Sequence, residues 1–183
     1  MSSYFPDNLK TGSAIPEELT PWLVYTQSLT DKLRQEAGDA ELAVLNQNQI
    51  PASWWDRFVL QVDAQPVTQR EILMSAHGKP CWYARTIIPD NTLTVNELLF
   101  GRLKQESLGD ILFGNDNIKR ISMINYIIDA NCIEYYWLDS AMRGDSQSFW
   151  ARLAMFEING ASPFFLIEIL LPGLLTALGH HSN

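Results

Sequence analysis

Two strand-like segments joined by a two-residue turn constrain the fold of this chain more than any other feature. Residues 70–76 and 79–88 are rich in β-branched, aromatic and other apolar side chains. His77-Gly78 lies between them, and a glycine-containing pair is typical of a tight β-hairpin turn. With these two as the loop residues, the register places Arg70 directly opposite Arg85. The sequence therefore predicts an antiparallel hairpin with two arginines facing each other.

The rest of the chain mixes further strand-like segments with short helices. Apolar patterning predicts strands over residues 41–46, 121–129, 134–138, 150–158 and 164–171. Capping residues predict helices or helical turns over residues 16–23, 29–37, 94–103 and after Ser107. Asn159-Gly160 predicts a second hairpin between the last two strands. Because strands dominate the second half and helices fill the gaps, we expect an α+β fold with a mainly antiparallel sheet.

Length and composition indicate one domain. The chain has 183 residues, 46% of them hydrophobic, which is enough for one sizeable core. We expect the domain to span residues 16–178, after a flexible lead-in over 1–15 and before a tail over 179–183. The N-terminus lacks the apolar centre of a signal peptide, and charge, proline and glycine interrupt the hydrophobic stretch 164–178. We therefore expect no membrane span.

Charge and cysteine content narrow the partners and the compartment. The formal net charge is −8 and no block of Lys or Arg occurs, which argues against nucleic acid or an anionic membrane as partner. A bound anion must therefore meet a local cluster of arginines. Cys81 and Cys132 lie far apart and outside any C-x-x-C pair, so neither a disulfide framework nor a zinc site is indicated. A reducing, cytoplasmic setting fits best.

Common catalytic motifs are missing from the sequence. It contains no G-x-S-x-G, Walker loop, G-x-G-x-x-G or H-E-x-x-H. The three histidines lie in the hairpin turn and the tail, so we expect neither histidine catalysis nor a histidine-bound metal. The remaining candidates are charged residues within apolar strands: Arg70, Arg85, Arg152 and Glu168.

Glu168 lies at the centre of the apolar segment 163–172. An ionised carboxylate taken out of water without a partner costs several kcal/mol, so it must be paired, hydrogen-bonded or protonated. Strand alternation places it on the same face as Phe164, Leu166 and Leu170. Two interpretations remain open at this point. Glu168 forms a structural ion pair with one of the arginines, or it lines a functional cavity.

The two facing arginines also allow two interpretations. Like charges across a strand pair are destabilising, and an anion between Arg70 and Arg85 would resolve the conflict, since guanidinium binds carboxylate through two hydrogen bonds. Alternatively, one arginine extends to water or pairs with Glu71 or Asp63. Leu108 follows the predicted Ser107 cap, where free backbone N–H groups can hold an anion.

Several short motifs, taken in order, resemble one known family. They are Trp22-Leu23, Ser28-Leu29-Thr30, Arg70-Glu71-Ile72-Leu73, Gly78-Lys79-Pro80-Cys81-Trp82, Ala84-Arg85-Thr86-Ile87-Ile88-Pro89, Ser107-Leu108-Gly109, Trp150-Ala151-Arg152 and Leu166-Ile167-Glu168-Ile169-Leu170-Leu171-Pro172. In order and spacing they resemble the chorismate lyase family, also called chorismate pyruvate-lyase, of bacterial ubiquinone synthesis. The chain departs from the family in having Leu29 where methionine is usual and in a longer stretch over residues 129–148.

The resemblance implies a cofactor-free lyase that converts chorismate to 4-hydroxybenzoate and pyruvate. It implies a six-stranded antiparallel sheet whose helices cover an enclosed pocket, in a protein that we expect to be a cytoplasmic monomer. By analogy, Arg70 binds the ring carboxylate together with the backbone N–H of Leu108. Glu168 meets the 4-oxygen, and Leu29 packs against the ring.

A mechanistic hypothesis joins these implied roles to the predicted hairpin. Arg85, with Arg152, would receive the enolpyruvyl carboxylate of chorismate. Glu168 would act at the ether oxygen, either as a hydrogen-bond donor to the departing enolpyruvate or in the transfer of the C4 proton. Orientation and exclusion of water would supply most of the rest, because aromatisation drives the reaction. The alternative is a non-catalytic module that binds small anions, because the same fold resembles the effector domains of GntR-type regulators.

Overall fold

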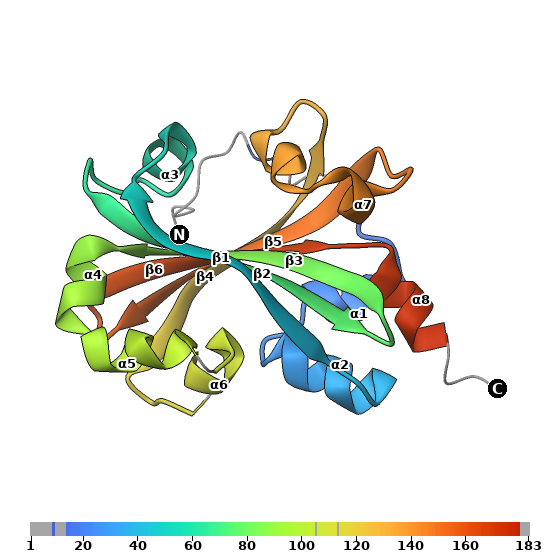
Figure 1. Ribbon diagram of the computed structural model, residues 1–183, viewed down its shortest axis with the longest axis horizontal. Coiled ribbons are helices and arrows are strands. Elements are labelled where there is room, and N and C mark those ends of the chain that lie inside the picture. The colour runs from blue at the N-terminus through green and yellow to red at the C-terminus, as the bar shows by residue number, and fades with distance from the viewer. Residues whose placement is uncertain (1–8, 10–13, 105, 113, 180–183) are drawn as a thin grey trace.

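The described residues form one antiparallel sheet of six strands at the centre of the molecule (Figure 1). The computed structural model describes residues 9, 14–104, 106–112 and 114–179. The strands are β1 (Glu41–Pro51), β2 (Pro66–Ala76), β3 (Lys79–Pro89), β4 (Ile118–Asp129), β5 (Ser148–Ile158) and β6 (Ser162–Leu170). Their order across the sheet is β1-β2-β3-β6-β5-β4. The predicted α+β class and mainly antiparallel sheet are confirmed.

Short helices cover both faces of this sheet. They are α1 (Thr20–Leu23), α2 (Leu29–Ala37), α3 (Trp54–Val59), α4 (Asp90–Val95), α5 (Glu97–Gly101), η1 (Arg102–Lys104), α6 (Leu108–Leu112), η2 (Ile133–Trp137), α7 (Ser140–Arg143) and α8 (Gly173–Gly179). In Figure 1, α3 and α7 lie above the sheet, and α1, α2, α5, α6 and α8 lie below it. No helix of the described chain is long and apolar enough to cross a membrane. The predicted lead-in and tail lie mostly outside the described residues.

Helix α2 begins and ends where the sequence predicts. The Ser28 hydroxyl accepts a hydrogen bond from the Asp31 N–H at 3.1 Å, which caps the first turn. Gly38 ends the helix with φ at 71°, a left-handed conformation that glycine adopts without steric cost. The helix buries Leu29 and Leu33 against the sheet. These contacts fix α2 over the part of the sheet that carries the candidate site.

Three apolar clusters surround the sheet, one on the face of α3 and two on the face of α2. Strand β6 shows the division, because Phe165 and Ile167 belong to the first cluster, and Phe164 and Leu170 belong to the other two. Alternate side chains of a strand point to opposite faces. The prediction that Glu168 shares a face with Phe164, Leu166 and Leu170 is therefore confirmed. Leu166 contacts both clusters on that face, so β6 runs beneath the boundary between them.

The predicted hairpin is present, but its predicted register is wrong. His77 and Gly78 form the turn with φ values of 51° and 67°. The two-residue turn favoured in hairpins requires a positive φ at both positions. A β-bulge between Met74 and Ser75 then shifts the pairing by one residue. Because of this shift, Arg70 pairs with Thr86 and Glu71 pairs with Arg85, and the two arginines point to opposite faces.

Two other segments differ from prediction. Residues 134–138 were expected to form a strand, yet residues 133–137 form the 3-10 helix η2. Its Trp137 ring packs edge-on against Trp55, with 4.9 Å between the ring centroids, whereas Tyr136 is largely exposed. The single helix predicted over 94–103 is broken at Asn96 into α4 and α5. Thr94 does not cap a helix there, because its hydroxyl donates to the Asp90 carbonyl inside α4 at 2.9 Å.

Candidate active site

A small cavity with charged groups in a largely apolar wall lies between the two apolar clusters on the α2 face. Its volume is about 40 Å³, and its lining comes from α2, four strands and the start of α6. The polar lining residues are Thr30, Arg70, Thr86, Ser107 and Glu168, and the apolar ones include Leu42, Ile72, Met74, Trp82, Leu108 and Leu166. Three of the predicted site residues, Arg70, Leu108 and Glu168, therefore meet here.

Arg70 is a buried cation in this cavity. Its exposed fraction is only 2%, and one guanidinium nitrogen, Nη2, donates to the Glu106 carbonyl at 3.5 Å. Among the described residues, no carboxylate lies within ion-pair distance, and Nε has no hydrogen-bond partner. Burial lowers the pKa of Arg70, which reflects the cost of holding its charge away from water. A buried guanidinium of this kind fits an anion bound in the cavity.

Leu108 places the first turn of α6 beside Arg70. The Ser107 hydroxyl accepts a hydrogen bond from the Asp110 N–H at 3.1 Å, which confirms the predicted cap. Leu108 is the first residue of the helix, and the first-turn N–H groups of a helix have no partner within it. The Glu106 carbonyl that contacts Arg70 lies two residues before Leu108. Arg70 and the start of α6 thus form one side of the cavity.

Glu168 lies in the cavity wall, paired with Arg152. The two residues are cross-strand partners of β5 and β6, and Arg152 Nε lies 2.8 Å from Glu168 Oε2. This contact is an ion pair without the alignment of a hydrogen bond. Arg152 also donates from Nη1 to the Trp22 carbonyl at 2.7 Å. The structural interpretation of Glu168 is therefore correct, and the residue also lines the cavity.

Arg120 is a charged residue at this site that the sequence reasoning missed. It is half-buried on β4, and its guanidinium donates to the Thr26 carbonyl and, at 3.4 Å, to Met123 Sδ. Burial lowers the pKa of Arg120, the charge of Arg152 lowers it further, and the carboxylate of Glu168 raises it. The charges of both members of the ion pair therefore act on the Arg120 guanidinium. The predicted strand began at residue 121, three residues after the start of β4 at Ile118, so Arg120 was not considered as a strand residue.

Arg85 lies outside the cavity, on the opposite face of the sheet. Its Nη2 donates to Glu71 Oε1 at 2.6 Å, and its Nε donates to the Tyr83 hydroxyl at 3.1 Å. Its guanidinium also stacks over the Trp137 ring, 3.7 Å from the centroid. The expectation that Arg85 joins Arg70 around an anion is wrong. The alternative, a pair with Glu71, is what the structure contains.

Leu29 is buried in the apolar cluster that also contains Ile72 and Trp82 of the cavity wall, although Leu29 is not itself among the lining residues. Its implied contact with the substrate ring stays a prediction. The next residue, Thr30, lines the cavity and supplies the contact surface of α2. The α2 wall of the cavity is therefore partly polar.

A wider hollow of about 370 Å³ adjoins the cavity on its outer side. Thr30, Leu42, Arg70 and Ser107 line both spaces. In the outer hollow, Arg34 pairs with Asp31 and Glu106 pairs with Arg102, and the carboxylate of Asp110 accepts a hydrogen bond from the Ser107 hydroxyl at 2.7 Å. Arg70 lies where the two spaces meet.

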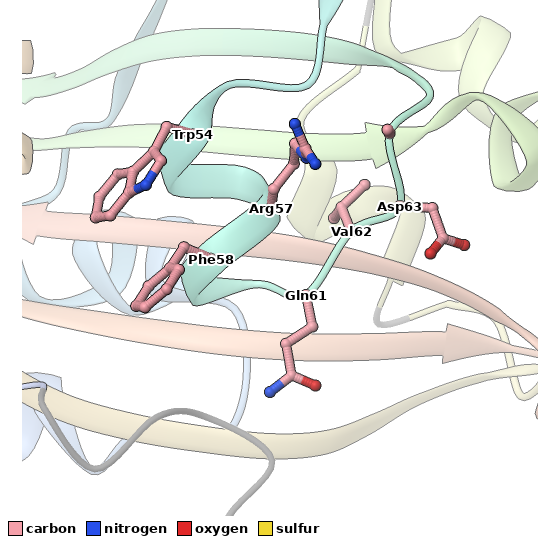
Figure 2. Close-up of a pocket in the computed structure, with 7 residues that line it drawn as sticks. Trp54, Arg57, Phe58, Gln61, Val62 and Asp63 are labelled. Atoms are coloured by element: carbon pink, nitrogen blue, oxygen red, sulfur yellow. The ribbon is translucent and has the colours of Figure 1, made fainter.

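A hollow of about 610 Å³ on the opposite face has a different character. Figure 2 shows its side chains fanning outward from α3 and the following loop, with Trp54 and Phe58 on one side and Arg57 and Gln61 pointing elsewhere. The Trp54 and Phe58 rings stack 5.0 Å apart and are largely exposed. The charged groups there do not converge, so the smaller cavity with Arg70 and Glu168 is the candidate active site.

No disulfide joins Cys81 and Cys132. Within the part of the chain that the structure describes, no group of three or more His, Cys, Asp or Glu residues is arranged to hold a metal ion.

Comparison with known proteins identifies the family. The family model described as chorismate lyase matches residues 6–178, nearly the whole chain. The chain therefore belongs to the chorismate lyase family, and the protein is a lyase.

Individual relatives agree with this family at modest identity. A probable chorismate pyruvate-lyase from Shewanella sp. strain W3-18-1 is 29% identical over 171 residues, covering 92% of this chain and 88% of that protein. One from Azoarcus sp. strain BH72 is 28% identical over 162 residues, covering 86% and 85%. The chorismate pyruvate-lyase of Escherichia coli O1:K1 is 26% identical over 164 residues, covering 87% and 86%.

Solved structures share the fold. The effector domain of PhnF from Mycobacterium smegmatis has a TM-score of 0.51 at 15% identity, over 80% of this chain and 89% of that one. The ligand-binding domain of a GntR-family regulator from Bordetella bronchiseptica has a TM-score of 0.50 at 11% identity, over 74% and 84%. At such low identity these likenesses concern the fold alone.

Proposed function

We propose that this protein is a chorismate pyruvate-lyase, which converts chorismate to 4-hydroxybenzoate and pyruvate as the first step of ubiquinone biosynthesis. The observation that carries the proposal is Arg70, a buried guanidinium without a carboxylate partner among the described residues, in a cavity that also contains Glu168. Membership of the chorismate lyase family supplies the reaction class.

The proposed substrate orientation follows from the charges in the cavity. The ring carboxylate of chorismate is held by Arg70 and by the N–H of Leu108, at the α6 side. The opposite end of the ring, with its 4-oxygen, then faces Glu168 on β6. Two groups of opposite charge thereby fix the two ends of the ring, and such fixed orientation accounts for a large part of catalysis in many enzymes.

The reaction needs no external reactant. The bond between ring carbon C3 and the ether oxygen breaks, the hydrogen on C4 is lost, and the ring becomes aromatic while it keeps its 4-hydroxyl. The released enolpyruvate gains one proton on its methylene carbon and becomes pyruvate. The role of Glu168 is to contact the 4-oxygen and to assist the transfer of the C4 proton.

The size of the cavity sets a condition for binding. One water molecule occupies about 30 Å³ in the liquid, so a cavity of about 40 Å³ is far smaller than chorismate. The adjoining hollow of about 370 Å³ begins at Arg70 and offers a route into the cavity. With the ring between Arg70 and Glu168, the bound substrate lies on the inner side of Arg70, so the side chains that line the cavity shift when it enters.

We also propose that the enzyme works in the cytoplasm as a monomer and without a cofactor. Two cysteines outside any disulfide framework suit a reducing compartment, and the acidic chain has no basic block that suits an anionic surface. The proposed chemistry uses only groups of the chain.

One assay tests the activity. Purified protein is incubated with chorismate, pyruvate is measured with lactate dehydrogenase, and the aromatic product is identified by chromatography. We expect pyruvate and 4-hydroxybenzoate in equal amounts. A 3-hydroxybenzoate peak would contradict the product assignment. Binding of chorismate without pyruvate release would contradict the lyase and favour a module that only binds small anions.

A further inference from the structure

We propose that Arg120 and Arg152 form a second anion subsite, next to Glu168, that receives the enolpyruvyl carboxylate of chorismate. The inference rests on the proposed function and replaces Arg85, which lies on the other face of the sheet. Arg120 has no role in the sequence-based hypothesis.

The pairing of strands β4, β5 and β6 brings the residues of the subsite together. Arg152 on β5 is paired with Glu168 on β6 and with Asn125 on β4. Arg120 on β4 pairs with Phe156, and its guanidinium lies 5.9 Å from the Phe156 ring, in the apolar cluster on the cavity face. Its hydrogen bond to the Thr26 carbonyl ties it to the chain just before α2. All of these groups therefore face the same side of the sheet as the cavity.

Two cations on this face have no ion-pair partner among the described residues. Arg152 and Glu168 neutralise each other in their ion pair. Arg120 donates to a backbone carbonyl and a thioether sulfur, and Arg70 donates to a backbone carbonyl. The carboxylate of Glu168 also acts on Arg120, but from beyond ion-pair distance. Chorismate carries two carboxylates, so its charge complements that of the site.

Unsatisfied polar atoms also concentrate on this face. Four buried side-chain atoms among the described residues lack a hydrogen-bond partner, and three of them belong to Arg70, Asn125 and Arg152. Buried polar atoms are satisfied in most folded proteins, because a buried donor or acceptor without a partner has lost its hydrogen bonds to water. Arg152 Nε lies against Glu168 Oε2, and Asn125 Oδ1 is an acceptor, so Arg70 Nε is the donor among these three atoms that a bound anion would satisfy.

The product of the reaction provides the test, because 4-hydroxybenzoate keeps the ring carboxylate and lacks the enolpyruvyl one. We expect Arg120→Gln to raise KM for chorismate at least about tenfold, the scale of one charge-assisted hydrogen bond, and to leave Ki for 4-hydroxybenzoate within about twofold. Arg70→Gln should weaken both ligands. Arg57→Gln, which removes an exposed charge on the opposite face, should change neither constant. Equal weakening of both ligands by Arg120→Gln, or no effect on chorismate, would overturn the proposal.

A second measurement uses the wild-type protein and so does not depend on the folding of a variant. The probes are 3-(1-carboxyvinyloxy)benzoate and its methyl ester at the side-chain carboxylate, with binding followed by tryptophan fluorescence. We expect the ester to bind at least about tenfold more weakly, and equal binding would refute the subsite. If the wild type released no pyruvate from chorismate, the proposed function would fail, whereas the ester comparison would still decide the subsite.

Discussion

The buried charge of Arg70 lowers the stability of the fold, and the same charge can bind an anionic ligand. A cation buried without a counter-charge destabilises a protein, and evolution retains such groups where they bind a ligand. We expect Arg70→Met to weaken 4-hydroxybenzoate binding by at least about tenfold, because a charge-assisted pair is lost. The same change should leave the thermal midpoint unaltered or raise it. Fluorescence titration and calorimetry on one preparation measure both quantities, and a variant that binds normally would contradict the assignment.

Glu168 is the residue whose chemical role is most open to direct test. We expect Glu168→Gln to lower kcat for pyruvate release about 100-fold or more, the usual scale of acid–base assistance, with a smaller change in KM. Glu71→Gln is the matched control, because Glu71 is a half-buried strand glutamate that is also paired with an arginine, yet it lies on the other face. It should cost stability and leave kcat unchanged. Full turnover by the Glu168→Gln variant would rule out its participation.

At the residue scale, Arg70 and Glu168 were candidates from the sequence because each is a charge inside an apolar strand. Leu108 follows a predicted helix cap, and its role as a backbone donor came from the family resemblance. Arg120 carried no such signal, since Lys119 precedes it and the strand was expected to begin later. Its role depends on which residues the neighbouring strands place beside it, and that is decided by register.

At the element scale, the β2–β3 hairpin shows what a local pattern can and cannot specify. The turn residues fix the position of the hairpin, and the structure agrees with the predicted loop. The bulge depends on contacts from distant elements, among them the Leu171 N–H, which donates to the Cys81 carbonyl at 2.9 Å. The alternation of apolar and polar residues along a single strand does not reveal such contacts. The predicted pairing of Arg70 with Arg85 failed for this reason.

The approach of α8 to the hairpin gives a prediction about stability. A Cβ atom added to Gly173 would lie 2.1 Å from the Pro80 carbonyl oxygen, so alanine cannot fit unless the backbone moves. We expect Gly173→Ala to lower the free energy of unfolding by about 1–3 kcal/mol. Gly179, at the other end of α8, has open space around it, so Gly179→Ala should be neutral or slightly stabilising. Urea unfolding compares the two variants, and equal midpoints would contradict the steric explanation.

At the scale of the whole molecule, the ionisable groups on the two faces of the sheet differ in whether they have ion-pair partners. The cavity face holds the uncompensated arginines, whereas on the other face Glu71, Tyr83 and Arg85 form a closed network beside Trp137. The fold class and the approximate location of the site could be predicted from the sequence, because they follow from the alternation of apolar and polar residues and from the turn residues. The division of charge between faces was not, because one bulge reverses the face on which a side chain lies.

The network on the far face predicts how acid affects the whole protein. Burial raises the pKa of Glu71, and hydrogen bonds from Tyr83 and Arg85 together with the charge of Arg85 more than offset this, so the pKa lies below its ordinary value of 4.5. A lowered pKa in the folded state adds stability that is fully present above pH 4.5 and is lost as the pH falls through the folded-state value. Glu71→Gln should therefore lower stability at pH 7 and show less further loss below pH 4.5. Urea midpoints from pH 7 to pH 3 measure this, and parallel curves for variant and wild type would contradict it.

The order of the strands has a consequence for synthesis of the chain. Strand β6 is the last to be translated, yet it lies between β3 and β5, so it alone joins the strand group that carries Arg70 to the group that carries Arg120 and Arg152. Until residues 162–170 have left the ribosome, the nascent chain holds two separate three-strand and two-strand pieces and no complete anion site. Long-range pairing of this kind is slow to form. The ability to bind chorismate would therefore appear only at the end of translation, and a truncated chain would lack it altogether.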